Sequence, residues 1–355
     1  MNTVIILFGG RSSEYEVSLS SATGAYNNIN KEKYNVLLVG ITREGRFFLY
    51  EDDPALIAKD KWTEGKKYPF SVDLSDGTVS VDRGDAIEHI KVDAVLPMIH
   101  GKFCEDGTLQ GLFAVAGIPV VGCDCQSSAV CMDKAVTKAI VAAETGVQQA
   151  KAVVIKTADA QTSEDITAIR IRSEAELGYP MFVKPSRAGS SVGVSKVKSA
   201  ETFEKALIAA LNEDSKVLIE ECIVGREIEV AVLEEKGAYI AAHPAEIDSG
   251  SADFYDYETK YISDASSFYL PARLSEEKQD EVREYALAIF KALDCSGFSR
   301  VDFFYTTDGR FVFNEINTLP GFTPISMYPK MMINEGISYS ELIDRLIGTV
   351  VAAEA

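Results

Sequence analysis

The first third of the chain alternates between strand-like and helix-like hydrophobic patterns. Apolar positions predict four elements here: a helix over 17–29 and strands over 3–8, 36–41 and 94–99. Strands that alternate with helices favour a parallel sheet, so we assign residues 1–122 to an α/β unit. The polar and less regular segment 44–90 gives no clear periodicity and stays unassigned.

The rest of the chain divides into two further parts. Residues 123–220 begin with a helix start at the motif MDK and an alanine-rich helix, and they end in a strand over 217–221. Residues 221–355 contain a hairpin and the carboxy-terminal helices. Because 355 residues exceed one ordinary hydrophobic core, we expect three domains with these boundaries.

The hairpin pattern lies in the segment SRVDFFYTTDGRFVFNEINTLPG. Two apolar, aromatic-rich runs flank Asp308-Gly309, a dipeptide that favours a tight two-residue turn. Such a turn places Thr307 opposite Arg310. The segment therefore predicts two antiparallel strands in a defined register.

The same register brings four polar side chains together. Asp302 lies opposite Glu315, and Arg300 lies opposite Asn317. Because side chains alternate along a strand, all four share one face, with opposed Cβ atoms roughly 4.5–5.5 Å apart. Two carboxylates and an amide suit magnesium, especially magnesium shared with nucleotide phosphates. The alternative is an exposed face with ordinary ion pairs; the turn at 319–321 favours a site, because it can present backbone N–H groups.

A glycine- and serine-rich loop follows an apolar strand in the segment YPMFVKPSRAGSSVGVSKV. Lys184 precedes the loop and strand-like runs flank it, so this is not a Walker A loop, which needs G-x-x-x-x-G-K-[ST] before a helix. Backbone N–H groups in such a loop can hydrogen-bond the oxygens of a triphosphate. A flexible hairpin tip is the alternative, and the acidic hairpin elsewhere in the chain favours nucleotide binding.

Charge and cysteine content narrow the range of partners. The 35 basic and 54 acidic residues give a formal charge of −19, and no basic cluster offsets it. Nucleic acid and anionic membrane surfaces are therefore poor partners, and a nucleotide must be held by a few placed lysines and magnesium. The six cysteines show no metal-ligand spacing, which indicates reduced, mostly structural thiols. Without a signal peptide or a membrane-spanning apolar run, we expect a cytoplasmic protein.

Eight motifs occur in an order that resembles a known family. They are GGRSSEYEVSLSSA, HGKFCEDGTLQG, MDK, KPSRAGSSVG, LIEECIVGREIEVAVL, FYDYETKY, SGFSRVDFF and NEINTLPGFTPIS. Together they are similar to the ATP-grasp enzymes and, within these, to the D-alanine–D-alanine ligases, nearly from end to end. The resemblance implies an α/β fold of three-domain ATP-grasp architecture, with a Rossmann-like parallel-sheet domain at the N-terminus.

The resemblance also implies roles at a nucleotide site. Lys134, Lys184 and Lys260 match lysines at the phosphates. Glu220, Glu221 and Ile223 match the segment that meets adenine, and Glu227 matches the carboxylate at the ribose. A solvated charge pair at a strand end is the alternative for Glu220 and Glu221. The ligands that match for Mg²⁺, or for Mn²⁺ in its place, are Asp302, Glu315 and Asn317.

Two residues near the predicted carboxyl edge of the first sheet match substrate-site residues. Glu14 matches the glutamate that holds the ammonium of the first D-alanine; the alternative is that it complements the dipole of the following helix. His100 matches a substrate-site histidine, although a lone histidine is more often structural, and we take His89 and His243 as structural. Cys104 stands where the family commonly has glycine, which could change the loop backbone.

The remaining matches concern a lid and the reacting groups. The tyrosine-rich segment SGSADFYDYETKYISD has the irregular composition of a lid, or alternatively of an exposed loop. A family triad of hydrogen bonds that closes such a lid matches Tyr261, Ser190 and Glu14. The oxyanion-stabilising groups match Arg300 and the N–H of Gly321, and the group that binds the second substrate's carboxylate matches Ser326.

The resemblance implies ATP-dependent ligation of two D-alanine molecules through a D-alanyl phosphate, for peptidoglycan precursor synthesis, by an enzyme that is usually a homodimer. Another ATP-grasp ligase should lack GGRSSEYEVS and FYDYETKY, and both are present. A regulatory protein without turnover should lack a metal ligand or a phosphate lysine, and none is missing. The lid argues against a D-lactate ligase, and a D-alanine–D-serine ligase stays an alternative.

Overall fold

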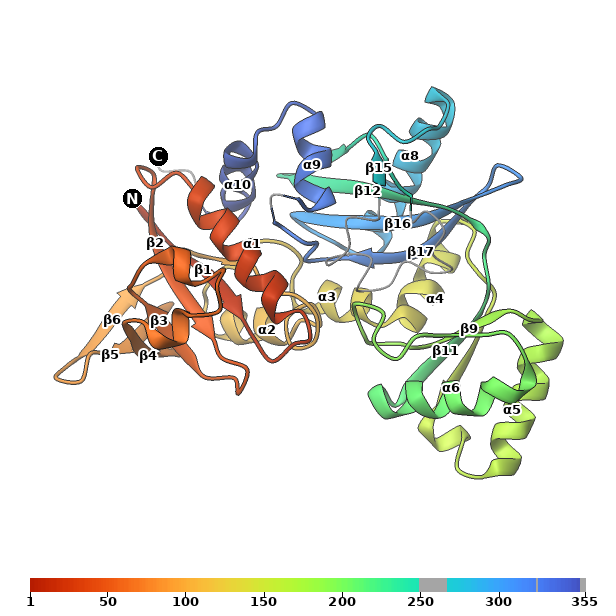
Figure 1. The fold of residues 1–355 in the computed structure, drawn as a ribbon. Coiled ribbons are helices and arrows are strands. Elements are labelled where there is room, and N and C mark those ends of the chain that lie inside the picture. The colour runs from red at the N-terminus through yellow and green to blue at the C-terminus, as the bar shows by residue number, and fades with distance from the viewer. Residues whose placement is uncertain (249–266, 324, 352–355) are drawn as a thin grey trace.

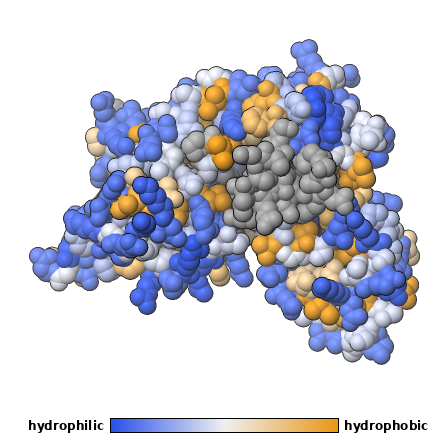
Figure 2. Space-filling view, in the orientation of Figure 1, coloured by the Kyte–Doolittle hydropathy of each residue, from blue (hydrophilic) through white to orange (hydrophobic). Residues whose placement is uncertain are grey.

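The computed structural model of the protein describes residues 1–248, 267–323 and 325–351. Within these ranges the strands form sheets of seven, four and six strands (Figure 1). None of the helices described is long and apolar enough to cross a membrane. Hydrophilic residues cover most of the visible face around the seven-stranded sheet (Figure 2).

The seven-stranded sheet contains the predicted parallel strands. β1 (Asn2–Gly9) pairs in parallel with β2 (Tyr34–Ile41) on one side and with β7 (Ala94–Pro97) on the other. α1 (Tyr15–Asn28) connects β1 to β2, and α2 (Thr108–Val115) follows β7. The strands and the helix predicted for this region are therefore confirmed, with small shifts at their ends.

The unassigned segment 44–90 makes the other half of this sheet. It forms strands and two short 3₁₀ turns: β3 (Phe47–Tyr50), β4 (Lys67–Val72), β5 (Thr78–Asp82), β6 (Ile87–Lys91), η1 (Pro54–Leu56) and η2 (Trp62–Glu64). From β2 to β6 every pairing is antiparallel. The sheet is thus mixed rather than parallel, because the β2–β3, β4–β5 and β5–β6 connections are too short for a parallel crossover.

The four-stranded sheet is antiparallel, in the order β10-β9-β11-β8. Its elements are β8 (Ala152–Lys156), η3 (Thr157–Asp159), α5 (Ser163–Leu177), β9 (Met181–Pro185), β10 (Ser195–Val197), α6 (Ala200–Glu213) and β11 (Lys216–Glu221). It has a hydrophobic core of its own, in which Phe203 and Leu207 of α6 pack on Val183 and Ile219.

The six-stranded sheet lies between two helical layers. Its strands are β12 (Gly225–Glu235), β13 (Ala238–Ala241), β14 (Ala245–Asp248), β15 (Ser267–Tyr269), β16 (Phe298–Thr306) and β17 (Phe311–Asn317). The helices are α3 (Cys125–Met132), α4 (Lys134–Glu144), α8 (Glu276–Ala292), α9 (Met327–Asn334) and α10 (Tyr339–Gly348). Side chains alternate along β12, so Val230 and Val232 share a core with α3, α4 and α8, whereas Ala231 and Leu233 face the core that includes α9 and α10.

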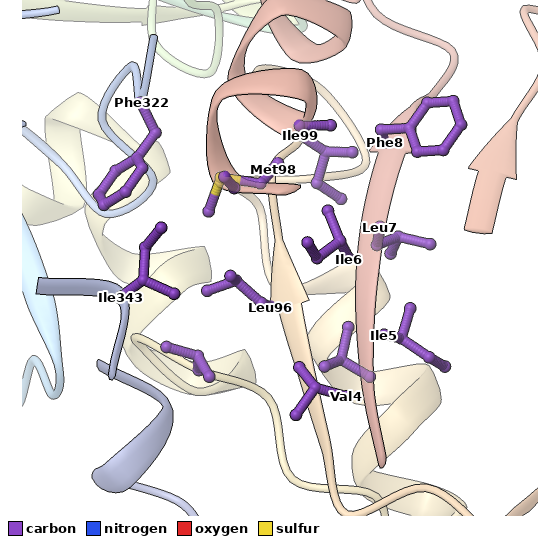
Figure 3. Packing of buried hydrophobic residues seen from close by; sticks show 14 of the residues in the cluster. Val4, Ile5, Ile6, Leu7, Phe8, Leu96, Met98, Ile99, Phe322 and Ile343 are labelled. Atoms are coloured by element: carbon purple, nitrogen blue, oxygen red, sulfur yellow. The ribbon is translucent and has the colours of Figure 1, made fainter. Parts of the chain in front are cut away.

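The core on the α9 and α10 side also contains the first sheet. Phe322 and Ile343 belong to the same cluster as Leu96 of β7 and Met98, which directly follows β7 (Figure 3). The first and third sheets therefore share one hydrophobic core, and the turn 319–323 is held directly against the carboxyl end of β7.

The turn of the β16–β17 hairpin differs from the prediction. Its loop has three residues, 307–309, and the N–H of Thr306 donates to the carbonyl of Arg310 at 2.9 Å. Gly309 has φ of +81°, the left-handed conformation that closes three-residue loops of this kind. The predicted two-residue turn is therefore wrong.

A β-bulge restores the predicted register at the polar residues. Pairing runs through Phe303 and Phe313, passes over Asn314, and resumes with Asp302 opposite Glu315. Arg300 lies opposite Asn317, as predicted, and this part of the register is confirmed. The bulge offsets the extra loop residue, so that the aromatic half of β17 faces the core while its polar end faces the other way.

Candidate functional site

Two adjoining cavities of about 370 Å³ and 420 Å³ lie beside the polar end of the hairpin. The first is lined by a set of predicted residues: Glu14, His100, Lys134, Ser190, Arg300, Glu315, Asn317, Gly321 and Ser326. The second is lined by another: Lys134, Lys184, Ser190, Glu220, Glu221, Ile223, Glu227 and Glu315. Asp302 lines neither cavity, and Lys260 and Tyr261 lie outside the described residues. Lys134 and Glu315 line both cavities, as do Ile247 and residues 188–190 of the glycine-rich loop, so the cavities meet where this loop approaches the Lys134–Glu315 pair.

Lys134 joins three parts of the site. It begins α4, and Asp133 before it caps the helix by accepting from the N–H of Val136. The Lys134 ammonium donates to the carbonyl of Ala188 at 3.0 Å and lies 3.1 Å from the Glu315 carboxylate. The helix start thus holds both the glycine-rich loop and the acidic hairpin.

A buried ionic cluster lies at the other end of the second cavity. The Glu220 carboxylate is 2.5 Å from the Lys184 ammonium and 2.8 Å from that of Lys138. Burial opposes the charge on Glu220, but the two ammonium groups outweigh it and lower the pKa of Glu220 to about 2. Lys134, which is paired with Glu315, also lies near Lys184, so three cations gather at this end of the cavity and favour an anionic ligand.

The glycine-rich loop carries unusual backbone conformations. Ser190 and Ser191 have φ of +48° and +57°, and Gly193 has φ of +72°. Non-glycine residues in the left-handed region store strain and are concentrated at functional sites. Runs of such residues turn successive N–H groups toward one side, which creates a concave anion-binding surface.

Glu14 faces the first cavity rather than its own helix. It precedes α1 but makes no side-chain capping hydrogen bond, and instead accepts one from Ser190 Oγ at 2.5 Å. Gly101, with φ of +75°, lies so close that a Cβ there would be 2.6 Å from Glu14 Oε2. Glu14 thus lies at the start of α1, where its charge can complement the helix dipole, and it also contacts the glycine-rich loop beside the first cavity.

His100 connects α1 to the turn after β17. Its Nδ1–H donates to the carbonyl of Leu319 at 2.9 Å, so Nε2 accepts from the Ser21 hydroxyl at 3.0 Å. Burial lowers the pKa of His100, and the nearby Glu14 only partly opposes this, so the ring is neutral. Both ring nitrogens are used within the fold, which makes His100 a structural link as well as a cavity-lining residue.

The cysteine beside His100 does not strain the loop. Cys104 is buried, and the non-glycine residue at positive φ is its neighbour Phe103, with φ of +65°. The departure from the family pattern at Cys104 therefore falls where glycine's freedom is not needed. All six cysteines are free thiols.

The polar face of the hairpin is an ion-pair network in the structure. Arg300 makes a two-point contact with Asp302, at 2.8 and 2.7 Å, and lies 3.3 Å from Glu229. Asn317 donates to Asp302 at 3.0 Å. Two carboxylates and an amide are too few for a protein-only metal cage, and no group of three His, Cys, Asp or Glu side chains suited to a metal occurs among the described residues. A small set of this kind is, however, what proteins usually supply to magnesium that is also bound by phosphates.

Ser326 and Gly321 meet at the far end of the first cavity. Ser326 precedes α9, and its hydroxyl accepts from the N–H of Thr323 at 3.0 Å. A Cβ at Gly321 would lie 2.9 Å from Ser326 Oγ, so a larger residue there would displace the serine. Ile325 and Met327 add apolar side chains to the same end.

Sequence reasoning missed three charged residues in the cavities. Lys138 follows Lys134 by one helical turn, and that spacing could have indicated a shared face. Glu229 lies opposite Asp302 in the β12–β16 pairing, which only the structure supplies. Glu105 belongs to a quoted motif, and burial together with Glu14 and Glu315 raises its pKa well above the ordinary range.

Comparisons with known proteins find one and the same family along nearly the whole chain. Family models described as D-ala D-ala ligase N-terminus and C-terminus match residues 3–123 and 141–348. A D-alanine–D-alanine ligase from Acetivibrio thermocellus is 44% identical over 370 aligned positions, covering 98% of this chain and 95% of the relative. Another from Caldicellulosiruptor bescii is 43% identical, with 98% and 94% covered.

Solved structures agree with these relatives. The VanG D-Ala:D-Ser ligase from Enterococcus faecalis superposes with a TM-score of 0.89 at 42% identity, covering 99% of both chains. A D-alanine–D-alanine ligase from Coxiella burnetii gives 0.83 at 33% identity, covering 98% of this chain and 93% of that one. With both family models matched in order, this chain belongs to the D-alanine–D-alanine ligase family.

Proposed function

We propose that this protein joins two D-alanine molecules into D-alanyl-D-alanine, with conversion of ATP to ADP and phosphate, as a step toward peptidoglycan precursors in the cytoplasm. Membership of the family implies ATP use and small-molecule substrates. The observation that carries the proposal is the meeting of the two cavities at Lys134 and Glu315. A nucleotide in the second cavity would place its terminal phosphate at the boundary with an amino acid in the first.

The proposed chemistry has two steps. First, a carboxylate oxygen of D-alanine attacks the γ-phosphorus, the bond to ADP breaks, and an acyl phosphate forms. Lys134 and Lys184 hold the phosphates, while Glu14 holds the substrate ammonium near the loop. Then the amine of the second D-alanine attacks the acyl carbon, a proton is lost, and phosphate leaves. Arg300 and the N–H of Gly321 stabilise the oxyanion of the tetrahedral intermediate, and Ser326 holds the second carboxylate.

We infer that Asp302, Glu315 and Asn317 hold Mg²⁺, or Mn²⁺ in its place. When bound, the ion neutralises charge on the β- and γ-phosphates during phosphoryl transfer. Arg300 makes a two-point contact with Asp302, so this carboxylate would be shared between the guanidinium and the ion. The donor set supports this assignment because it is acidic and rich in oxygen.

Further parts of the proposal rest on the family resemblance. Lys260 would touch the γ-phosphate, and Tyr261 would close a lid that keeps water from the acyl phosphate. Glu221, Ile223 and Glu227 would contact adenine and ribose. We also propose that the domains meet at 122/123 and 220/221 and that the protein is a homodimer.

The proposed function is tested by measuring phosphate release from ATP with a panel of D-amino and D-hydroxy acids, with products identified by mass spectrometry. D-Alanine, ATP and Mg²⁺ together should give the dipeptide and ADP. Phosphate release with D-alanine but without dipeptide, or no phosphate release at all, would contradict the proposed function.

D-Serine is the alternative second substrate, because the VanG D-Ala:D-Ser ligase is among the similar structures. Three apolar residues lie near Ser326 in the sequence: Ile325 and Met327 line the cavity, while Phe322 is buried in the core. Thr323 also lines the cavity, but its hydroxyl is hydrogen-bonded to Ser326 at 2.8 Å. The pocket thus offers little to a substrate hydroxyl.

We therefore expect D-alanine to be preferred over D-serine at the second site by about a hundredfold in kcat/KM, since an apolar pocket rejects an added hydroxyl only modestly. Met327→Gln should shift the ratio toward D-serine, and Ile333→Gln, on the exposed side of α9, should not. Competition assays with both amino acids measure the ratio. A higher kcat/KM for D-serine in the unmodified enzyme would contradict the expectation.

Glu14, Ser190 and Tyr261 should behave as one unit. Ser190 donates to Glu14 across 176 residues of sequence, so Ser190→Ala removes this hydrogen bond and Glu14→Gln weakens it by replacing the charged acceptor with a neutral amide. Their combined effect on kcat/KM should then fall short of the sum by roughly 0.5–3 kcal/mol, as for residues in contact. Tyr261→Phe should weaken discrimination at the second site more than it weakens ATP binding.

A double-mutant cycle in steady-state kinetics measures this coupling. Ser191→Ala, in the same loop, combined with Glu14→Gln serves as the matched control and should be additive. Additive losses for Glu14→Gln and Ser190→Ala would mean that the hydrogen bond has no part in catalysis.

A further inference from the structure

A ring of polar contacts joins the four-stranded sheet to the start of α4. Lys216, the first residue of β11, places its ammonium 2.5 Å from Asp133 Oδ2. Ser186, which directly follows β9, donates from its hydroxyl to Asp133 Oδ1 at 2.7 Å and from its N–H to the carbonyl of Lys216 at 2.8 Å. These three residues, which we call the joint, have no role in the chemistry proposed above.

The joint also binds the first N–H groups of α4. The carbonyl of Ser186 accepts from the N–H of Lys134 at 3.0 Å, and its hydroxyl oxygen accepts from that of Ala135 at 3.1 Å. Asp133 Oδ1 accepts from the N–H of Val136 at 3.3 Å. Such donors have no partner within the helix itself. Because the joint supplies their acceptors, the start of α4 and the end of β9 are fixed relative to each other.

The joint lies largely out of solvent. Ser186 is fully buried, and the side chains of Asp133 and Lys216 are 10% and 20% exposed. Burial opposes the charge on Asp133, but the Lys216 ammonium and the Ser186 hydroxyl outweigh it and lower the pKa of Asp133. A buried ion pair adds little net stability compared with apolar packing of the same volume. Stability alone is therefore a weak reason for this arrangement.

The position of the joint connects it to the phosphate site. The strands on one side belong to the core of the four-stranded sheet, whereas Val141 of α4 belongs to a core of the six-stranded sheet. Lys134 follows Asp133 directly, and its ammonium donates to the carbonyl of Ala188 in the glycine-rich loop. A shift at the joint would therefore move Lys134 relative to this loop, at the place where the two cavities meet.

We propose that Lys216 is a positioning residue for phosphoryl transfer, which acts through Asp133 to hold the Lys134 ammonium in place beside the glycine-rich loop. The inference rests on the proposed use of ATP. Without Lys216, the carboxylate of Asp133 keeps its contacts at Oδ1 but loses the cation at Oδ2, so the start of α4 is free to shift. A misplacement of about 1 Å in such a site can lower a rate on the order of a hundredfold.

The test asks whether Lys216 acts through Lys134. Lys216→Met is made alone and in a Lys134→Met background, and kcat/KM for ATP is measured from dipeptide formation at saturating D-alanine. Lys216→Met should lower kcat/KM about tenfold in the first case and less than about twofold in the second, because residues that act as a unit are not additive. The same loss in both backgrounds would show a general structural effect and would overturn the inference.

Companion variants separate the charge from the shape of the joint. Lys216→Arg keeps the cation and should retain most of the activity. Asp133→Asn keeps a side chain that caps helices well but removes the charge, so its loss of kcat/KM should match that of Lys216→Met. Lys205→Met, on the exposed side of α6, is the matched control for loss of a lysine from the same part of the chain and should leave kcat/KM unchanged.

Normal kcat/KM in folded Lys216→Met would also overturn the inference. If that variant melts far below the unmodified protein, or if Lys134→Met is too slow to assay, Asp133→Asn decides: a folded Asp133→Asn protein with reduced kcat/KM supports the inference, and one with normal kcat/KM overturns it. The proposed function fails separately, if the unmodified protein forms neither dipeptide nor ADP with D-alanine.

Discussion

Replacement of Glu315 by glutamine is expected to lower turnover by at least about a hundredfold while the protein stays folded. The change removes a negative charge but little volume at the point where the two cavities meet. It also releases the Lys134 ammonium, which lies 3.1 Å from the carboxylate. Losses of this size are usual when one preorganised charge is removed from a site where charge develops during reaction.

Steady-state rates of dipeptide formation and thermal melting of the same preparations measure this effect. Asp308→Asn is the matched control, because it makes the same charge change at the exposed tip of the same hairpin. It should keep nearly full activity. Turnover close to normal in Glu315→Gln would remove this carboxylate from the mechanism.

Replacement of Arg300 by methionine should damage both stability and activity. Its guanidinium is shared by Asp302 and Glu229, whose side chains are only 1% and 4% exposed. Removal of one partner from a buried ion pair typically costs about 3–5 kcal/mol of unfolding free energy, and we expect the lower end because Asn317 still donates to Asp302. Loss of an oxyanion donor should also reduce turnover by about a hundredfold or more.

Denaturant unfolding and steady-state kinetics test the two effects separately. Arg310→Met, at the exposed tip of the hairpin, is the control and should change neither quantity much. Arg300→Lys keeps the charge but not the two-point geometry, so it should recover stability better than activity. Normal stability in Arg300→Met would mean that the two carboxylates are compensated by other groups.

The sequence predicted local elements better than the connections between them. The register at Asp302 and Glu315 was correct although the turn was not, because a bulge at Asn314 offsets the third loop residue. A period-two pattern cannot reveal such a bulge, since it assumes one residue per step on each strand. The antiparallel half of the first sheet could not be predicted for a different reason: its strands are short, and polar residues are frequent in them.

Contacts between distant segments could not be predicted from the residue pattern. The hydrogen bonds from Ser190 to Glu14 and from His100 to Leu319 join residues 176 and 219 positions apart. The family resemblance suggested the first of these pairs, and nothing suggested the second. Lys138 was missed because its partner Glu220 lies on a strand far along the chain, so the pair has no local signal.

The separate core of the four-stranded sheet has a consequence for cooperativity. The other two sheets share a core and should melt as one unit, whereas the sheet that carries Lys184 and the glycine-rich loop can open by itself. Triphosphate bound between the four- and six-stranded sheets would strengthen the coupling of two melting transitions that polar contacts such as Lys138–Glu220 and Ser190–Glu14 connect in its absence. Bound nucleotide would then raise the stability of the unit with the four-stranded sheet by mass action. That unit would lose this stabilisation when the nucleotide dissociates.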